Sequence, residues 1–157
     1  MPYRKILLVD NEKRVIDLLG MILESNGFIA RKAYSGEEAL RKVQGEKYAV
    51  AILDYLLPDM KGDDLAERIR IENPEIGLIM LTGWKHAIEP AKLNKFNYVF
   101  EKPVAPQEIV AAVKQMTMVL KKSVSAQKPL DQLALNGYAR RSVDIENPDE
   151  ERASARI

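Results

Sequence analysis

The chain contains no cysteine among its 157 residues. Disulfides and thiolate metal sites are therefore excluded, and a reducing cytosol fits this composition, so we expect a cytoplasmic protein. Long apolar runs are also missing, since none approaches the roughly 20 residues that a membrane helix needs. The short apolar run near the start is too brief for a signal peptide. We expect one domain with an extension and no association with a membrane.

An excess of one charge is missing as well. The 24 Lys and Arg residues nearly balance the 23 Asp and Glu residues, which leaves a net charge of +1. Proteins that hold nucleic acid through bulk electrostatics carry a basic surplus, so we expect no direct binding to nucleic acid. Histidine is nearly absent too. We interpret the lone His86 as an exposed helix residue that cannot form a catalytic triad with a nearby nucleophile.

What the chain does have is four short apolar segments that lead into polar residues used in phosphoryl chemistry. These residues are Asp10 after 6–9, Asp54 after 49–53, Thr82 after 76–81 and Lys102 after 98–100. Apolar runs of this kind, separated by helical segments, predict the buried strands of a parallel sheet. Ligands of such sheets bind outside the carboxyl ends of the strands, near the point where strand order reverses. We therefore expect two carboxylates, a hydroxyl and an ammonium to meet in one crevice.

The segments between these runs have helical patterns. Helices are predicted at 12–25, 35–43, 63–72, 84–94 and 106–122, and a further short strand at 28–33. Ser35 with Glu38 three residues later predicts a capping box, and Pro90 is expected to interrupt its helix. The βα pattern, repeated five times, predicts an open, doubly wound α/β sheet with right-handed crossovers.

The composition changes after the last predicted helix. We expect a folded domain at 1–122 and a mostly flexible C-terminal tail at 123–157, with a short helix at 129–136. Such a tail is too short for a typical DNA-binding output domain, so output would pass through contacts with an unknown downstream protein. The last helix suggests a surface for that partner or for a homodimer, because it has apolar residues away from its main stripe. They are Val110, Ala111, Met118 and Val119, and burial beneath the tail would explain them as well.

Four motifs together resemble the receiver domain of two-component response regulators, over about residues 3–120. They are ILLVDNE at 6–12, ILDYLLPDMKG at 52–62, LTG at 81–83 and EKPV at 101–104. Each motif alone is a weak signal, but all four occur in the right order at predicted strand ends. The resemblance implies a flavodoxin-like (βα)5 fold with five parallel strands in the order 2-1-3-4-5. It also implies a phosphoprotein of two-component signal transduction or of a phosphorelay.

The resemblance implies a site for phosphoryl transfer. Asp54 matches the phosphoacceptor, which would take its phosphoryl group from a phosphohistidine on a sensor histidine kinase or a phosphotransfer protein. Thr82 matches the hydroxyl that binds a phosphoryl oxygen, and Lys102 matches a cation that balances its charge. The Lys102–Pro103 bond matches a position where the family often has a cis peptide. Such a protein is not a classical enzyme, because it phosphorylates and dephosphorylates itself.

The resemblance also implies a Mg²⁺ site beside the phosphoacceptor. Its ligands match Asp10, Asn11, Asp54 and the backbone carbonyl of Leu56. Oxygen donors of this kind suit a hard octahedral cation. The family usually has a second acidic residue where this chain has Asn11, so we expect functional but weaker Mg²⁺ binding. Glu12 could compensate by turning inward, although its default role is a favourable charge near a helix N-terminus.

Two further departures concern signalling. Many receivers have an aromatic residue at the position of Val99, whereas this chain has Tyr98 and Phe100 on either side. Strand alternation sends those two to the opposite face, so the usual aromatic switch is absent or relocated. Leu56 and Trp84 lie two residues beyond the phosphoacceptor and the hydroxyl. We expect them either to shield an acyl phosphate from water or, in the case of Trp84, to form part of a partner-binding patch.

Two other interpretations stay open. A pseudo-receiver, a protein-binding module of the same fold that phosphate does not switch, is favoured by Asn11 and Val99. The intact phosphoacceptor, hydroxyl and lysine positions oppose it. A small phosphatase of the haloacid-dehalogenase type would need a second aspartate two residues after Asp10, where Glu12 stands. It would also need an acidic pair late in the chain, and neither the pattern nor the length suits it.

Overall fold

The computed structural model describes residues 4–126. The helix predicted at 129–136 and most of the predicted tail lie outside these residues. Within the described part of the chain, no helix is both long enough and apolar enough to span a membrane.

Five parallel strands form one sheet in the order β2-β1-β3-β4-β5. They are β1 (Lys5–Val9), β2 (Ile29–Ala33), β3 (Val50–Asp54), β4 (Gly77–Thr82) and β5 (Tyr98–Glu101). The predicted fold and strand order are confirmed. Strand order reverses between β1 and β3, so the carboxyl ends of these two central strands mark the expected ligand position.

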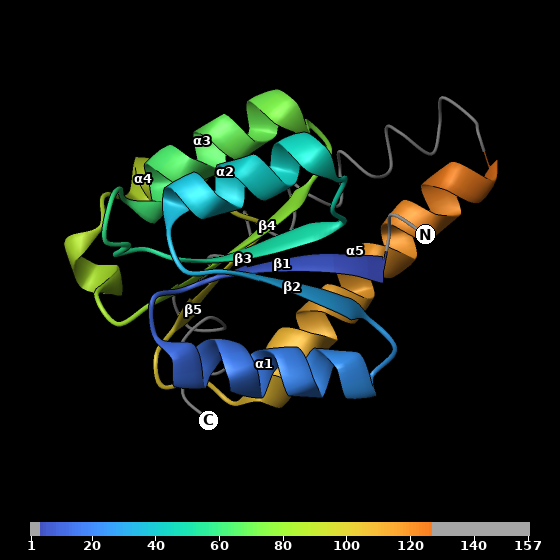
Figure 1. The fold of residues 1–157 in the computed structure, drawn as a ribbon, viewed down its shortest axis with the longest axis horizontal. Helices are drawn as coiled ribbons and strands as arrows, with labels where there is room; N and C mark the ends of the chain where they lie inside the picture. The colour runs from blue at the N-terminus through green and yellow to red at the C-terminus, as the bar shows by residue number, and fades with distance from the viewer. Residues whose placement is uncertain (1–3, 127–157) are drawn as a thin grey trace.

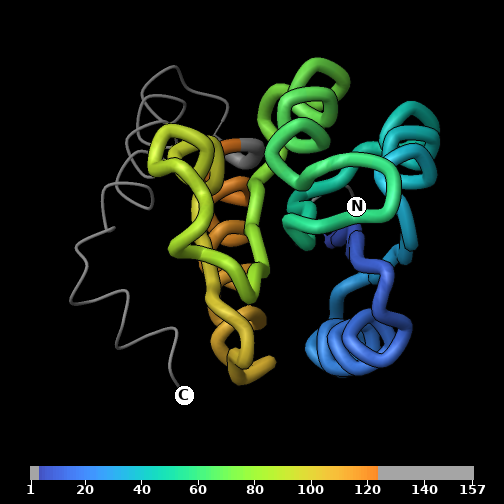
Figure 2. The backbone as a smooth tube through the Cα atoms, turned by 90° about the vertical axis from the view of Figure 1, so that its left-hand side faces the viewer, coloured from blue at the N-terminus to red at the C-terminus, as the bar shows by residue number. Residues whose placement is uncertain are grey.

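Helices cover both faces of the sheet (Figure 1). They are α1 (Lys13–Ser25), α2 (Gly36–Gly45), α3 (Gly62–Glu72), α4 (Pro90–Leu93) and α5 (Pro106–Ala126), with the 3₁₀ helix η2 at Lys85–Ala87. One face carries α1 and α5, and the other carries α2, α3 and α4. Figure 2 views the molecule from the left-hand side of Figure 1, where the loops after the strands gather.

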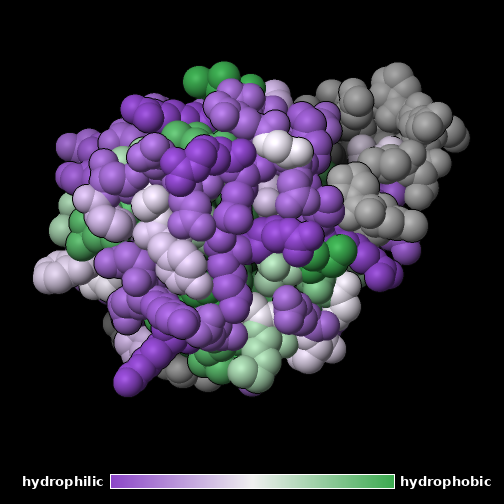
Figure 3. All heavy atoms as spheres, viewed as in Figure 1, coloured by the Kyte–Doolittle hydropathy of each residue, from purple (hydrophilic) through white to green (hydrophobic). Residues whose placement is uncertain are grey.

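The two-sided cover explains why the central strands β1, β3 and β4 are apolar along nearly their whole length. Leu7 and Val9 of β1 belong to the core under α2, α3 and α4, whereas Ile6 and Leu8 belong to the core under α1 and α5. All four are at most 2% exposed. The face seen in Figure 3 is mostly hydrophilic, because the apolar side chains of the sheet are turned inward to these two cores.

The predicted capping box at the start of α2 is present, except that Glu38 binds the N–H of Tyr34 instead of the N–H of Ser35. The Ser35 hydroxyl accepts the N–H of Glu38 at 3.1 Å, while the Glu38 carboxylate accepts the N–H of Tyr34 at 2.9 Å. Asp59, from the loop after β3, adds a second cap that the sequence did not suggest. Its carboxylate oxygens accept the N–H groups of the first two residues of α2, at 2.9 and 2.8 Å. The loop that follows Asp54 is therefore attached to α2.

Two predicted helices take a more detailed form in the structure. The predicted interruption of the stretch from 84 to 94 at Pro90 is present, because η2 ends at Ala87 and the four-residue α4 begins at Pro90. Proline suits the first helical position because an N–H there would have no helical partner. The last helix, α5, continues to Ala126 instead of ending at 122. On α5, Val110 belongs to the core at 5% exposure, whereas Met118 is 58% exposed.

Candidate functional site

The carboxyl edge of the sheet brings the four predicted polar residues together. Asp10 follows β1, Asp54 ends β3, Thr82 ends β4 and Lys102 follows β5. The Lys102 ammonium lies 3.0 Å from Asp10 Oδ2 and 3.6 Å from Asp54 Oδ1. The Lys102 backbone N–H donates to the Thr82 carbonyl at 2.9 Å, which fixes the two strand ends side by side. One cation thus bridges two carboxylates at the switch point of the sheet.

Asp10 is almost fully buried, at 3% exposure, and both of its carboxylate oxygens have partners. Oδ1 accepts the N–H of Glu12 at 2.8 Å, and Oδ2 accepts a hydrogen bond from Lys102. Burying a charge is costly unless it is paired and hydrogen-bonded, and both conditions are met here. Asp10 is therefore held as a fixed negative charge beside Asp54.

The negative charge of Asp54 is poorly stabilised by its surroundings. Burial raises the pKa of its carboxyl group to about 6, and the nearby charge of Asp10 acts in the same direction. The Lys102 ammonium and the N–H groups of Tyr55 and Leu56 partly oppose this rise. Asp54 is thus mostly ionised at neutral pH, but its charge is poorly stabilised. A bound cation, or a reaction that consumes the charge, would lower the electrostatic cost of this carboxylate.

Lys102 stays charged in this setting. Burial alone would lower its pKa, but the hydrogen bond to Asp10 and the charges of Asp54, Asp10 and Glu12 outweigh burial, so its pKa is raised. The ammonium can serve as a permanent counter-charge for an anion at Asp54. The Lys102–Pro103 peptide bond is cis, as expected.

Thr82 is completely buried, and its hydroxyl oxygen accepts the backbone N–H of Trp84 at 3.0 Å. A hydroxyl that accepts one hydrogen bond can still donate its own hydrogen, so Thr82 can bind the oxygen of an incoming anion. Trp84 and Leu56 are 63% and 47% exposed. Both are therefore apolar surface residues, each two positions beyond a residue of the site.

The loop after β3 approaches the site closely, and this explains Gly62. A Cβ atom at Gly62 would lie 2.4 Å from the backbone oxygen of Asp54, which is far inside contact distance. The N–H of Gly62 donates to the Tyr55 carbonyl at 2.7 Å. The start of α3 is thus packed closely against the backbone of Asp54. Local sequence patterns do not reveal this contact.

The oxygen donors at the site suit a hard cation, but they are few. Asp10 and Asp54 supply carboxylates, Asn11 is exposed next to Asp10, and Leu56 follows in the loop after Asp54. In the described part of the chain, no three His, Cys, Asp or Glu residues gather into a metal-binding group. The amide at Asn11 is one reason, because an acidic residue there would supply a third carboxylate. The Glu12 side chain is exposed and makes no capping bond to α1.

The predicted position of the aromatic residues on β5 is confirmed. Val99 is buried in the core under α2, α3 and α4. Tyr98 and Phe100 belong to the opposite core, where their rings stack with centroids 6.0 Å apart. No aromatic side chain therefore extends from position 99 toward α4.

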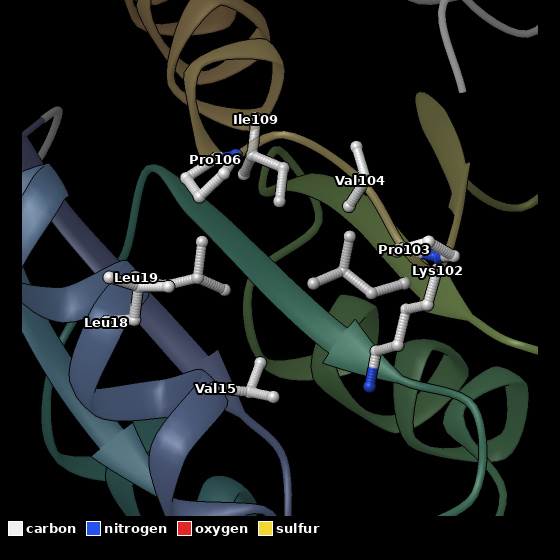
Figure 4. A pocket seen from close by; sticks show the side chains of 9 residues that line it. Val15, Leu18, Leu19, Lys102, Pro103, Val104, Pro106 and Ile109 are labelled. Carbon is white, nitrogen blue, oxygen red and sulfur yellow. The ribbon is translucent and has the colours of Figure 1, made fainter. Parts of the chain in front are cut away.

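A groove of about 200 Å³ lies beside the site, between α1 and the segment that leads into α5. Its apolar lining includes Val15, Leu18, Leu19, Val104, Pro106 and Ile109 (Figure 4). Lys102 also lines the groove, and Figure 4 shows its amine directed toward the end of β3. An apolar surface thus adjoins the charged site.

The family model of the response regulator receiver domain matches residues 6–114. This chain belongs to the response regulator receiver domain family, whose members serve two-component systems. Among its relatives is the alkaline phosphatase synthesis transcriptional regulatory protein PhoP of Bacillus subtilis, 33% identical over 114 residues. Another is the transcriptional regulatory protein SrrA of Staphylococcus aureus, 35% identical over 115 residues. Each alignment covers 71% of this chain and 47% of the relative, so the chain spans about half the length of these proteins.

Solved structures agree on the fold. A CheY-like receiver domain protein from Methanospirillum hungatei aligns with a TM-score of 0.70 and 29% identity, over 76% of this chain and 98% of that one. The response regulator TrrA from Thermotoga maritima, solved in complex with Mg²⁺ and BeF, aligns with a TM-score of 0.67 and 29% identity. That alignment covers 72% of this chain and 98% of TrrA.

Proposed function

We propose that this protein is a phosphoacceptor in two-component signalling and that Asp54 carries the phosphoryl group. A carboxylate oxygen of Asp54 would attack the phosphorus of a phosphohistidine on a sensor histidine kinase or a phosphotransfer protein. An O–P bond forms and the P–N bond breaks, while the imidazole nitrogen keeps the electron pair of the broken bond. The observation that carries the proposal is the grouping of Asp54 with Asp10 and Lys102, whose ammonium lies 3.6 Å from the Asp54 carboxylate.

The residues around Asp54 would divide the work of holding the transferred group. Lys102, already charged and directed toward β3, would pair with one phosphoryl oxygen. The Thr82 hydroxyl would donate its hydrogen to another. Neither group needs to change its protonation state, so both are prepared in advance for the negative charge.

We further propose Mg²⁺ as the cofactor, because the donors at the site are hard oxygen ligands. Asp10, Asn11, Asp54 and the Leu56 carbonyl would hold the ion, which neutralises charge on the phosphoryl oxygens when bound. Lys102 would then turn from Asp10 toward the phosphoryl group. The Mg²⁺ and BeF bound in TrrA, a relative with the same fold, support this assignment.

The groove between α1 and α5 supports a docking position for the phosphodonor. Its apolar lining lies beside Lys102, so a helix seated there would bring its histidine close to Asp54. The downstream partner remains unidentified, and a homodimer through the exposed part of α5, around Met118, is one arrangement to test. We further propose that the protein acts in the cytoplasm and does not bind nucleic acid directly.

A pseudo-receiver is the second candidate. The specific observation in its favour is that, among the residues the structure describes, no third carboxylate joins Asp10 and Asp54 in a metal-binding group, and Lys102 is bonded to Asp10 where a cation would bind. Such a protein would use the same fold for protein contacts without responding to phosphoryl groups.

Mass spectrometry distinguishes the two candidates. The protein is incubated with acetyl phosphate and Mg²⁺ and digested, and the Asp54 peptide is analysed. We expect this peptide to gain the mass of one phosphoryl group and to lose it with hydroxylamine, as an acyl phosphate does. Asp54→Asn should show no gain, whereas Asp64→Asn, an exposed aspartate on α3, should behave as wild type. An unmodified Asp54 peptide in wild type would favour the pseudo-receiver.

A further inference from the structure

A row of polar contacts joins α3 to the segment that runs from α4 into β5. Three side chains of α3, spaced four and three residues apart, each meet a polar partner on that segment. The contacts are Asp63 with Lys92, Glu67 with Lys95, and Arg70 with Asn97. Residues with this spacing lie on one face of a helix, so the three contacts form a continuous line, which we call the polar seam.

The seam is buried at the Asp63 end, where the ion-pair distance is long. Asp63 is 2% exposed, and its Oδ2 lies 3.8 Å from Lys92 Nζ, while its Oδ1 has no hydrogen-bond partner among residues 4–126. A buried carboxylate in this condition is costly, because its desolvation is only partly compensated. The contact between Arg70 and Asn97 is also long, at 3.5 Å, and Arg70 Nε is buried without a hydrogen-bond partner in the described part of the chain. The seam is thus a weak restraint on α4, in which Lys92 partly compensates the buried charge of Asp63.

The buried end of the seam is joined to the reactive carboxylate. Asp63 follows Gly62, which contacts the backbone oxygen of Asp54 and donates to the Tyr55 carbonyl. On the other side, the chain leads back from Lys92 in α4 through η2 to Trp84, whose N–H is bonded to the Thr82 hydroxyl. The Asp63–Lys92 contact therefore connects the two segments that follow Asp54 and Thr82. Both of these residues would touch a phosphoryl group.

We propose that the polar seam sets the position of α4, and that the Asp63–Lys92 pair is a positioning contact which favours the unphosphorylated arrangement. This inference rests on the proposed function. With valine at position 99, no aromatic side chain links β5 to α4, whereas the seam links the start of α3 to α4 directly. A ligand at Asp54 can shift α4 only by the difference in its affinity for the two arrangements. Weakening the pair removes part of the resistance to that shift.

The test compares beryllofluoride titrations of wild type, Lys92→Met and Lys92→Arg at fixed Mg²⁺. Trp84, the single tryptophan, reports the change by fluorescence, and hydrogen exchange of the amides in α4 gives a second measure. We expect Lys92→Met to reach its midpoint at about three- to tenfold lower beryllofluoride, as coupling energies of this kind allow. Lys92→Arg keeps the charge and should stay near the wild-type midpoint. Lys121→Met, which removes an exposed lysine from α5 outside the seam, is the matched control.

The outcomes separate the seam from the function on which it rests. A midpoint that is equal in wild type, Lys92→Met and Lys121→Met would overturn the seam inference alone, and so would a midpoint that rises in Lys92→Met. A wild type that responds to beryllofluoride by neither measure would overturn the proposed function and the seam with it. If Lys92→Met fails to fold, Lys95→Met at the more exposed Glu67 contact should shift the midpoint in the same direction, by less.

Discussion

The two sides of the sheet hold their outer helices by different kinds of contact. Between α1 and α5 the contacts are apolar and leave a groove lined by residues such as Leu19 and Ile109. Between α3 and the segment from α4 into β5, the outer contacts are the polar seam of three side-chain pairs. Apolar contacts depend little on direction and mainly supply stability. Polar contacts are short-ranged and directional, so they define a position.

The largest expected effect tests the apolar side. Leu23 of α1 is fully buried, so Leu23→Ala should lower the free energy of unfolding by about 3–4 kcal/mol, through lost burial and the cavity that remains. Urea denaturation measures this loss. Leu18→Ala, at a position 48% exposed, should cost less than about 1 kcal/mol. If Leu23→Ala shifted the beryllofluoride midpoint as much as Lys92→Met does, the two sides would not differ in the way described.

A second large effect concerns the poorly stabilised carboxylate of Asp54, at the end of the central strand β3. The pKa of Asp54 is about 6 in the folded protein against 3.8 for an ordinary aspartate. Asp54 therefore favours the folded state below pH 3.8, and this contribution is lost as the pH rises through 6. The loss is about 3 kcal/mol at most.

Asp54→Asn removes this titration. In Mg²⁺-free buffer, its free energy of unfolding relative to wild type should increase between pH 4 and pH 6 and reach a gain of up to about 3 kcal/mol at neutral pH. Denaturation at several pH values measures the difference, with the exposed Glu75→Gln as control. A variant that is less stable than wild type at neutral pH would contradict the poor stabilisation assigned to the Asp54 charge.

An intermediate effect is expected at Gly62, where the start of α3 packs against Asp54. Gly62→Ala places a Cβ atom against the Asp54 backbone oxygen, and the shift needed to relieve this overlap should cost about 2 kcal/mol. The same change should slow phosphorylation, because the loop that carries the reactive carboxylate must move. Gly45→Ala is the matched control, since no atom lies within 4 Å of its added Cβ. Equal stability of the two variants would remove the role given to the close contact.

The smallest effect concerns Asn11, at the edge of the site near α1. Asn11→Asp should increase Mg²⁺ affinity by roughly tenfold, because it adds one negative charge to a partly exposed cation site. Calorimetric or fluorescence titration with Mg²⁺ measures the change. Equal affinities of wild type and variant would show that Asn11 lies too far from the ion to matter.

The features that the sequence predicted are those encoded locally. The strands, the capping box at Ser35 and the opposite faces of Val99 and Phe100 follow from residue spacing. Their convergence at one edge follows from parallel topology. Features made by residues distant in sequence were not predicted, such as the Asp59 cap on α2. Asp63 was predicted only as the start of a helix, and its contact with Lys92 was not predicted because the two residues are 29 positions apart.

One expectation for the last helix was wrong, whereas the expected break before it is confirmed. Val110 looked like part of a second surface of the last helix, but it is buried in the core that α5 shares with α1. A periodic pattern does not reveal how wide a face its neighbours cover. The predicted interruption at Pro90 is present, because η2 ends at Ala87 and α4 begins at Pro90. Proline disfavours a helix interior but suits a helix start.

Phosphorus NMR of the protein during incubation with acetyl phosphate and Mg²⁺ tests the central claim most directly. Wild type should develop a protein-bound acyl phosphate resonance that is absent from Asp54→Asn and strongly reduced in Lys102→Met. A wild-type spectrum without this resonance, or the same resonance in Asp54→Asn, would contradict the assignment of Asp54 as the phosphoacceptor.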